Sequence, residues 1–262
     1  MKLAIHGATG RMGLAVIRAA RADGVDIVGG ACSPNDPGVG RDLGDLSGTG
    51  PLGVVATEDV ASALLGADVV IDFSLGSVAP NLFATAARQR VAIVSGTTGL
   101  DANGERALEK AAGAVPVLWS PNMSLGVQVL AEAVEQAVRR LGPAFDVEIV
   151  ELHHRRKIDA PSGTARRLAE AARAGRPELT ELHSRAGDVG ARKPNELGVF
   201  GIRGGDVIGD HTVFLLGNGE RLELTHRAGS RDLFAEGALF AAKFVSRKPP
   251  GRYTLADALG AR

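Results

Sequence analysis

The chain has 262 residues, of which 45% are hydrophobic, 4% aromatic and 23% charged, and its formal net charge is zero. That length allows one large domain or two smaller ones, with enough apolar residues for a sizeable core. Zero net charge and few aromatic rings argue against nucleic-acid binding, which needs a broad basic face or stacking platforms.

The single cysteine, Cys32, excludes an intramolecular disulfide bond. No apolar run reaches the roughly 18 residues that a membrane-spanning helix needs. The opening residues already have the pattern of a strand and a turn, so we expect no signal peptide and no membrane partner. Together these features favour a cytoplasmic protein.

A strand, a glycine-rich turn and a helix are predicted at the start of the chain. Lys2–His6 is a short apolar run, residues 7–13 read Gly-Ala-Thr-Gly-Arg-Met-Gly, and Leu14–Ala22 has helical composition. This order is typical of a dinucleotide-binding unit, in which glycines let a pyrophosphate approach a helix start. The spacing G-x-x-G-x-x-G departs from the usual G-x-G-x-x-G, and a plain tight turn is the alternative interpretation.

Short apolar strands then alternate with helices as far as residue 119. The predicted strands are Val25–Ala31, one starting at Val54, Asp68–Phe73, Val91–Ser95 and Val115–Trp119. The predicted helices are Glu58–Leu65, Ser77–Arg90 and Asp101–Ala112, with Asp101 as a cap and residues 38–53 as a loop. Such alternation indicates a Rossmann-like, doubly wound parallel sheet, an α/β fold.

Small polar residues follow two of these predicted strands, as Gly96-Thr97-Thr98 and Ser120-Pro121-Asn122-Met123. Ligands bind beyond the carboxyl ends of parallel strands, where hydroxyls and exposed amides suit a nicotinamide carboxamide and its ribose. Taken singly, each segment is more often an ordinary loop. Their position in register with the glycine turn predicts one cofactor site.

The end of the second predicted strand lacks the acid that usually holds the ribose hydroxyls. It reads Ala-Cys-Ser-Pro from residue 31, and the nearest acid is Asp36. The missing acid weakens an assignment to NAD alone, and Ser33 with Arg11 across the turn would tolerate a 2′-phosphate. The sequence therefore leaves the choice between NADH and NADPH open.

The pattern changes after a long amphipathic helix at Gly126–Leu141. The later predicted elements are a strand at Asp146–Leu152, a helix at Gly163–Ala174 with the apolar stripe Ala165, Leu168, Ala169 and Ala172, an irregular segment at Gly175–Leu197, strands at Gly198–Arg203, His211–Leu216 and Arg221–His226 with a hairpin turn at residues 217–219, and a helix at Ser230–Ser246. They indicate a C-terminal α+β domain with a mixed, largely antiparallel sheet, covered on one side by helices.

Residues 151–167 contain five Arg or Lys and two Asp or Glu, a local charge of +3 in a neutral chain. His153 and His154 are adjacent, so on an extended segment their side chains point to opposite sides. Imidazole titrates near neutrality and suits proton transfer, and Lys157 suits a carboxylate or a developing negative charge. This composition predicts a site that holds an anionic small molecule and moves a proton.

Pro161 indicates a helix start with Ser162, Gly163 and Thr164 in its first turn, where free amides and the helix dipole bind anions. A solvated basic loop with Ser162 as an ordinary N-cap is the alternative. A metal site is not favoured, because adjacent histidines do not easily ligate one ion and no cysteine or carboxylate stands at ligand spacing nearby.

Five motifs in chain order together resemble the 4-hydroxy-tetrahydrodipicolinate reductase (dihydrodipicolinate reductase) family of bacterial lysine and diaminopimelate biosynthesis. They are Gly7-x-x-Gly-Arg-Met-Gly13, Gly96-Thr-Thr-Gly99, Pro121-Asn-Met-Ser124, Glu151-Leu-His-His154 through Lys157-x-Asp-Ala-Pro-Ser-Gly-Thr-Ala165, and Arg203-Gly-Gly-x-x-x-Gly209-Asp-His211. The fourth is the most specific, and the five span nearly the whole chain.

The resemblance implies a dinucleotide-binding domain at 1–124, to which 234–262 returns, and a substrate-binding and oligomerisation domain at 125–233 in a homotetramer. It implies hydride transfer from NADH and/or NADPH to a small heterocyclic dicarboxylate, with loss of water. His153 and Lys157 match the family's catalytic residues. His154, Ser162, Gly163 and Thr164 match its substrate contacts.

The cofactor contacts implied by the resemblance are Gly7, Ala8, Thr9, Gly10, Arg11, Met12, Gly96, Thr97, Thr98, Ser120, Pro121, Asn122 and Met123. Cys32 and Ser33 stand where family members commonly carry an acid followed by arginine. We expect these two residues near the adenosine ribose.

Two other functions compete with this one. A dehydrogenase of the aspartate-semialdehyde type needs a nucleophilic cysteine, and Cys32 lies at a strand end away from the predicted nicotinamide site. An NAD(P)-binding redox sensor without catalysis would not need His153, Lys157 and the Ser-Gly-Thr turn together. Asp159 is either a partner of Lys157 or a helix-entry residue, of which we favour the second. The roles of Arg203, His211 and Arg231, as supporting groups or domain-interface groups, stay open.

Overall fold

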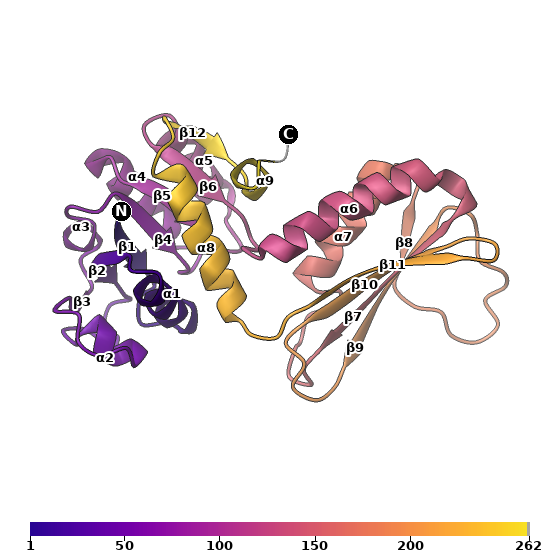
Figure 1. The fold of residues 1–262 in the computed structure, drawn as a ribbon, viewed down its shortest axis with the longest axis horizontal. Coiled ribbons are helices and arrows are strands. Elements are labelled where there is room, and N and C mark those ends of the chain that lie inside the picture. The colour runs from indigo at the N-terminus through magenta and orange to yellow at the C-terminus, as the bar shows by residue number, and fades with distance from the viewer. Residues whose placement is uncertain (261–262) are drawn as a thin grey trace. The chain divides into compact units, whose positions relative to one another are not determined.

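The computed structural model describes residues 1–260, which divide into two compact units. The first unit comprises Met1–Leu125 and the described residues from Arg231 onward, and the second comprises Gly126–Ser230. The final stretch of chain thus rejoins the first unit, where helix α8 (Asp232–Val245) lies beside α1 (Arg11–Ala22) in Figure 1.

A parallel sheet of seven strands forms the centre of the first unit, in the order β12-β6-β5-β4-β1-β2-β3. The strands are β1 (Lys2–His6), β2 (Asp26–Ala31), β3 (Ala56–Thr57), β4 (Val69–Asp72), β5 (Ala92–Ser95), β6 (Pro116–Trp119) and β12 (Gly251–Tyr253). All neighbouring strands run parallel. The predicted doubly wound sheet is confirmed, and β12 is a strand that the sequence patterns did not reveal.

Helices cover both faces of this sheet, which explains why its central strands are continuously apolar. Apolar side chains of α1 and α8 form one core with the sheet, and those of α4 (Ala79–Gln89) and α5 (Ala102–Ala112) form another. The prediction that residues 38–53 form only a loop is wrong. A short helix, α2 (Leu43–Ser47), begins there because the Asp42 carboxylate accepts the amide hydrogens of Gly44 and Asp45. The remaining short helices of this unit are α3 (Val60–Ala63) and α9 (Leu255–Ala258).

The second unit contains a mixed sheet of five strands in the order β11-β10-β7-β9-β8. The strands are β7 (Asp146–His153), β8 (Thr180–Leu182), β9 (Glu196–Arg203), β10 (Asp210–Leu216) and β11 (Arg221–Arg227). Strand β10 pairs antiparallel with β7 and β11, whereas β9 pairs parallel with β7 and β8. The predicted mixed sheet is confirmed, but β8 lies in a segment that the sequence predicted to be irregular.

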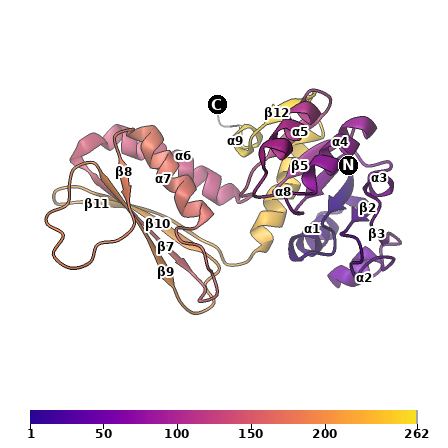
Figure 2. The same ribbon diagram turned by 180° about the vertical axis from the view of Figure 1, so that it is seen from behind.

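Two helices, α6 (Leu125–Leu141) and α7 (Gly163–Gly175), lie along one face of this second sheet (Figure 2). The predicted apolar stripe of α7 is buried against the sheet. A 3-10 turn at Gly142–Ala144 joins α6 to β7, and Gly217 closes the hairpin between β10 and β11 by donating its amide hydrogen to Glu220. None of the helices among residues 1–260 is long and apolar enough to span a bilayer.

The buried face of strand β7 changes from apolar to polar residues along its length. Its alternate residues Val147 and Ile149 are buried under the helices, and the next two positions on the same face are Glu151 and His153. Strand periodicity thus places a carboxylate and an imidazole on the core side of the sheet, where the sheet ends.

Candidate functional site

The glycine turn after β1 is built for close backbone approach. Gly7 has a φ of +78°, which favours glycine, and a Cβ at Gly13 would lie 2.2 Å from the Gly7 carbonyl oxygen. Helix α1 begins at Gly10 without a side-chain cap, and its first turn holds no acidic residue. The amides at this helix start are therefore available to an anion, and they fit the pyrophosphate of a dinucleotide.

A pocket of about 360 Å³ opens beyond the glycine turn. Its lining includes Gly7, Thr9, Gly10, Cys32 and Ser33, all of which are predicted cofactor contacts. Two carboxylates, Asp36 and Glu58, also line it, and Asp36 accepts a hydrogen bond from Thr9 Oγ1 at 2.9 Å. The strand-two end thus has acids nearby, although neither occupies the usual position.

Cys32 is buried, and its Sγ contacts the carbonyl oxygen of Thr57 at 3.5 Å. Burial raises the pKa of this thiol, and the negative charges of Asp36 and Glu58 raise it further. The thiol is therefore held in its protonated form, which is the opposite of what a nucleophilic cysteine needs. This environment disfavours the competing dehydrogenase function.

Asp72 connects the strand ends of the first unit, a role that was not predicted from the sequence. Its buried carboxylate contacts His6 Nδ1 at 2.9 Å, Ser95 Oγ at 2.8 Å and Thr97 Oγ1 at 2.7 Å. These hydrogen bonds tie β4 to the ends of β1 and β5. They lower the pKa of Asp72 against the opposing effect of burial. A lone acid inside an apolar strand was the only available signal.

Five further predicted cofactor residues line a second hollow of about 350 Å³ in the first unit. Arg11, Met12, Pro121, Asn122 and Met123 line it together with Phe73, Arg231 and Phe234. Arg11 lines this hollow, whereas Ser33 lines the pocket beyond the glycine turn. Of the others, Thr97 is buried, and Gly96 has no room for a side chain because a Cβ there would lie 2.3 Å from the Phe73 ring. Ala8 is buried and Thr98 is exposed. Ser120 Oγ is held by the carbonyl oxygen of Asn122 at 2.7 Å.

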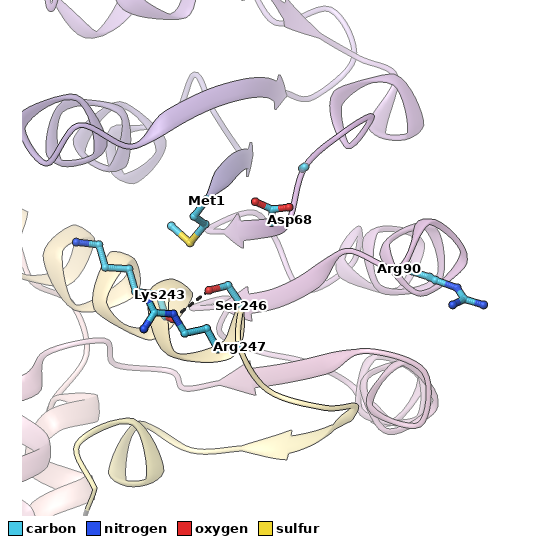
Figure 3. A pocket seen from close by; sticks show the side chains of 7 residues that line it. Met1, Asp68, Arg90, Lys243, Ser246 and Arg247 are labelled. Atoms are coloured by element: carbon cyan, nitrogen blue, oxygen red, sulfur yellow. Dashed lines mark hydrogen bonds between the residues drawn. The ribbon is translucent and has the colours of Figure 1, made fainter.

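Figure 3 shows a further pocket, lined by Met1, Asp68, Arg90, Lys243, Ser246 and Arg247 among others. It lies at the amino ends of β1 and β4, away from the strand ends where the predicted residues gather. Lys243 forms an ion pair with Asp23, the Lys2 amide donates to Asp68, and Arg90 points away from the other labelled side chains. Nothing in this lining converges on a ligand.

In the second unit, Glu151 and His153 form the centre of the cation-rich segment. Glu151 is fully buried, and its carboxylate accepts from His153 Nδ1 at 2.5 Å and from both Nη atoms of Arg203 at 2.8 Å. The amide hydrogen of Ser162 is a fourth donor, at 3.1 Å. The strand end, the neighbouring strand and the start of α7 thus meet at one carboxylate.

Ser162 is the N-cap of α7, as the sequence predicted, and its Oγ accepts from the Ala165 amide at 3.2 Å. The same oxygen lies 3.0 Å from His211 Nε2, and the His211 ring packs edge-on against His153 with centroids 5.1 Å apart. Gly163 is exposed, and a Cβ there would meet nothing within 4 Å. The first turn of α7 is therefore open to a ligand beside the two imidazoles, with Thr164 next to it.

Lys157 contacts Asp159, with Nζ at 2.7 and 2.9 Å from the two carboxylate oxygens. The preference for Asp159 as a mere helix-entry residue is therefore wrong, because its carboxylate pairs with Lys157, two residues earlier. Lys157 holds the pKa of Asp159 below its usual range. His154 follows at the end of β7, where its amide donates to the carbonyl oxygen of Val207 at 2.7 Å.

Both imidazoles near the helix start are held in the neutral form. Burial lowers the pKa of His153 despite the opposing effect of Glu151, and burial lowers the pKa of His211 to about 4. The carboxylate of Glu151 stays ionised, since Arg203 and His153 lower its pKa against the effect of burial. A neutral imidazole beside an anion-binding helix start can accept and return a proton. Among residues 1–260, no cluster of three or more His, Cys, Asp or Glu side chains is arranged to hold a metal ion.

Comparison with known proteins gives matches along the whole chain. The family model for the N-terminus of dihydrodipicolinate reductase matches residues 1–123, and that for its C-terminus matches residues 126–259. A 4-hydroxy-tetrahydrodipicolinate reductase of Anaeromyxobacter dehalogenans is 48% identical over 265 aligned residues, covering 100% of this chain and 98% of that protein. The enzyme of the same name from Myxococcus xanthus is 45% identical, covering 99% and 98%.

Solved structures support the same fold. The dipicolinate-bound dihydrodipicolinate reductase of Paenisporosarcina sp. TG-14 has a TM-score of 0.77 at 23% identity, covering 97% of each chain. An amine dehydrogenase of Mycobacterium smegmatis has a TM-score of 0.65 at 17% identity, covering 97% of this chain and 95% of the other. At these identities the likeness concerns the fold alone.

Proposed function

Because this chain belongs to the dihydrodipicolinate reductase family, and so reduces 4-hydroxy-tetrahydrodipicolinate with a pyridine nucleotide in lysine biosynthesis, we propose that His153 and Lys157 carry the proton chemistry of that reaction. The main support for this proposal is the buried imidazole of His153, which Glu151 holds beside the first turn of α7. A redox sensor without catalysis has no use for such an arrangement.

The substrate is a dianion, and the start of α7 is a suitable receptor for it. Gly163, which is exposed, lies with Thr164 at the positive end of a helix of 13 residues, and Lys157 lies in the preceding segment. His154 and Ser162 complete the proposed substrate contacts. The relative from Paenisporosarcina holds dipicolinate, itself a dicarboxylate, which supports this chemistry.

Loss of water from the substrate requires a base for a ring proton and an acid for the departing hydroxyl. Nε2 of a neutral His153 accepts the first proton and returns it to the departing hydroxyl. One residue is thus both the base and the acid of the elimination, and no net proton is gained or lost. A bound reduced nicotinamide supplies the hydride. The Lys157 ammonium donates the proton that must accompany the hydride, and it balances the negative charge that develops.

The first unit is the proposed dinucleotide-binding domain, residues 1–124 with 234–262, and residues 125–233 the substrate-binding and oligomerisation domain. The proposed cofactor contacts belong to the dinucleotide-binding domain. They are the helix start at Gly10, the pocket around Cys32 and Ser33, and the loops at 96–98 and 120–123. The pocket beyond the glycine turn contains Asp36 and Glu58, whose negative charges oppose a 2′-phosphate. We therefore propose a preference for NADH over NADPH.

We propose that the protein is a homotetramer and that the uncovered face of the second sheet forms its interface. No described helix of the second unit covers that face, and it carries the partly exposed apolar side chains Val150, Leu152, Phe200, Ile202 and Phe214. Burial of such a face against other copies removes apolar area from water. Light scattering on the purified protein tests the tetramer. A cytoplasmic location is proposed from the biosynthetic role.

Replacing Lys157 with Gln tests the proposed site. We expect kcat to fall by about 100-fold or more, since general acid catalysis contributes on that scale, and KM for the dicarboxylate to rise. The dissociation constant for the dinucleotide should stay unchanged. Lys193→Gln, at an exposed position of the same unit, is the matched control. A Lys157→Gln enzyme with wild-type kcat would refute the assignment.

A further inference from the structure

Glu151 is buried beside His153 and has no role in the chemistry described so far. We propose that Glu151 is a positioning residue, which holds His153 with its proton on Nδ1 and leaves Nε2 for the substrate, and that Arg203 and the start of α7 hold Glu151 itself. This inference rests on the proposed role of His153, and it adds Glu151 and Arg203 to the site as positioning residues.

The geometry of the carboxylate supports this role. Each oxygen of Glu151 has two donors: Oε2 accepts from His153 Nδ1 and Arg203 Nη1, and Oε1 accepts from Arg203 Nη2 and the Ser162 amide. A carboxylate with all its positions filled cannot rotate without losing hydrogen bonds. Because an ionised carboxylate can only accept, Nδ1 of His153 must carry the hydrogen.

That constraint decides what the other ring nitrogen can do. In the neutral imidazole, a hydrogen on Nδ1 leaves a lone pair on Nε2, which is the form that accepts a proton. Among the described residues, no hydrogen-bond partner is found for Nε2, so no side chain competes for that lone pair. Glu151 thus fixes both the tautomer and the orientation of His153.

Two glycines leave room for this arrangement, one in β9 and one directly before β10. A Cβ at Gly201, opposite Glu151 on β9, would lie 2.9 Å from Glu151 Oε1 and 3.2 Å from Arg203 Nη1. A Cβ at Gly209 would lie 2.9 Å from His153 Nε2. Glycine at 201 lets the arginine reach the carboxylate, and glycine at 209 keeps the space at Nε2 clear. Within the motif that runs from Arg203 to His211, Arg203 and Gly209 thereby acquire a physical purpose.

Arg203 also links the pair to the catalytic segment. Its Nη2 donates to the Asp159 carbonyl oxygen at 2.7 Å, two residues beyond Lys157. One guanidinium therefore holds the carboxylate that orients His153 and the backbone of the segment that carries Lys157. Through these two contacts, the Arg203 guanidinium fixes the positions of His153 and Lys157 relative to each other.

The test is the pH profile and the kcat of Glu151→Gln. We expect kcat to fall by about 100-fold or more, because an amide does not enforce one tautomer, with little change in KM for the dinucleotide. The limb of kcat/KM that reports His153 should move to lower pH by roughly one unit, since a negative partner that favours the imidazolium is lost.

The chain offers a matched control in Glu181. It lies two residues before His183 in the same unit and pairs with Arg173, which repeats the carboxylate, histidine and arginine combination away from the site. Glu181→Gln should leave kcat and the pH profile within about twofold of wild type, as expected of an ion pair near the surface. A loss in Glu181→Gln equal to that in Glu151→Gln would mean a general structural effect and would overturn the proposal.

Two further variants separate the possible failures. If Glu151→Gln does not fold, Gly201→Ala displaces the carboxylate without removing a charge, and wild-type kcat in that variant would overturn the inference. His153→Ala distinguishes the inference from the function on which it rests. If His153→Ala is inactive while Glu151→Gln retains wild-type kcat and pH profile, only the positioning role fails. If His153→Ala is fully active, the proposed function fails with it.

Discussion

Single residues set the charge that each unit presents to its ligand. In the first unit, Asp36 and Glu58 stand in the pocket beyond the glycine turn, and both raise the pKa of Cys32. In the second unit, Glu151 is neutralised by Arg203, so its burial leaves no uncompensated charge. The proposed cofactor pocket is thus negative, whereas the proposed substrate segment is positive.

Glu58→Gln and Asp36→Asn test the consequence for cofactor choice. Each removes a negative charge from the pocket while keeping the side-chain size, so kcat/KM with NADPH should rise relative to NADH by roughly three- to tenfold per charge. Steady-state kinetics with both cofactors measure that ratio. Glu105→Gln, on the exposed side of α5, is the control. Wild-type enzyme that prefers NADPH would contradict the proposal.

His211 predicts a pH-dependent loss of stability. Its pKa is lowered to about 4 by burial, whereas an unfolded histidine titrates near 6.5. Between these values the unfolded chain binds more protons, so this contribution is complete above about pH 6.5 and is lost as the pH falls towards 4. Urea unfolding at pH 7.5 and 5.0 should show that wild type loses about 2 kcal/mol more than His211→Gln on acidification. An equal loss of unfolding free energy in wild type and His211→Gln would contradict this role of His211. His183→Gln, at an exposed histidine, is the control and should behave like wild type.

The sequence predicted residues that are unusual by type but not residues whose role depends on a distant partner. His153, Lys157 and Ser162 were identified because they form a rare local combination. Glu151 was not, because its meaning depends on Arg203, which is 52 positions away. Asp159 was misjudged because its position before the predicted helix was preferred over a pair with Lys157, two residues away.

At the scale of elements, we expect the first turn of α7 to contribute both to folding stability and to substrate binding. Ser162→Ala removes the cap of the Ala165 amide and the contact with His211, so the free energy of unfolding should fall by about 1–2 kcal/mol. The KM for the dicarboxylate should rise as well, because the same turn is its proposed receptor. Chemical denaturation and steady-state kinetics measure the two effects.

Asp101→Ala provides the comparison, since Asp101 caps α5 in the first unit with a hydrogen bond from the Gly104 amide. It should cost similar stability and leave the KM for the dicarboxylate unchanged. If the two variants have the same KM, the start of α7 is only a structural cap.

The long elements were predictable because burial imposes a period on them. Strands β1, β4 and β5 and helices α4, α5 and α7 occur within a few residues of their predicted positions. The short elements were not. Strands β8 and β12, at three residues each, and helix α2 have no period to detect, and they form because a neighbouring strand or the Asp42 cap provides their hydrogen bonds.

At the scale of the whole molecule, we propose that one unit binds the cofactor and the other the substrate of a single reaction. The first is a doubly wound sheet with an uncapped helix start at its glycine turn, and the second presents a polar strand end beside a capped helix. The family match extends across both units, so the reductase activity is a property of the full chain. The fold class followed from the sequence, since the strand-helix alternation of the first unit stops where the second begins.

The most direct test of this account is the oxidation of NADH or NADPH with freshly made condensation product of pyruvate and aspartate semialdehyde, followed for wild type, His153→Ala and His183→Ala. We expect wild type and the exposed-histidine control His183→Ala to oxidise the cofactor at similar rates, and His153→Ala to lose about 100-fold or more in kcat while still binding dinucleotide. Equal rates in all three proteins would contradict the assignment of the chemistry to His153.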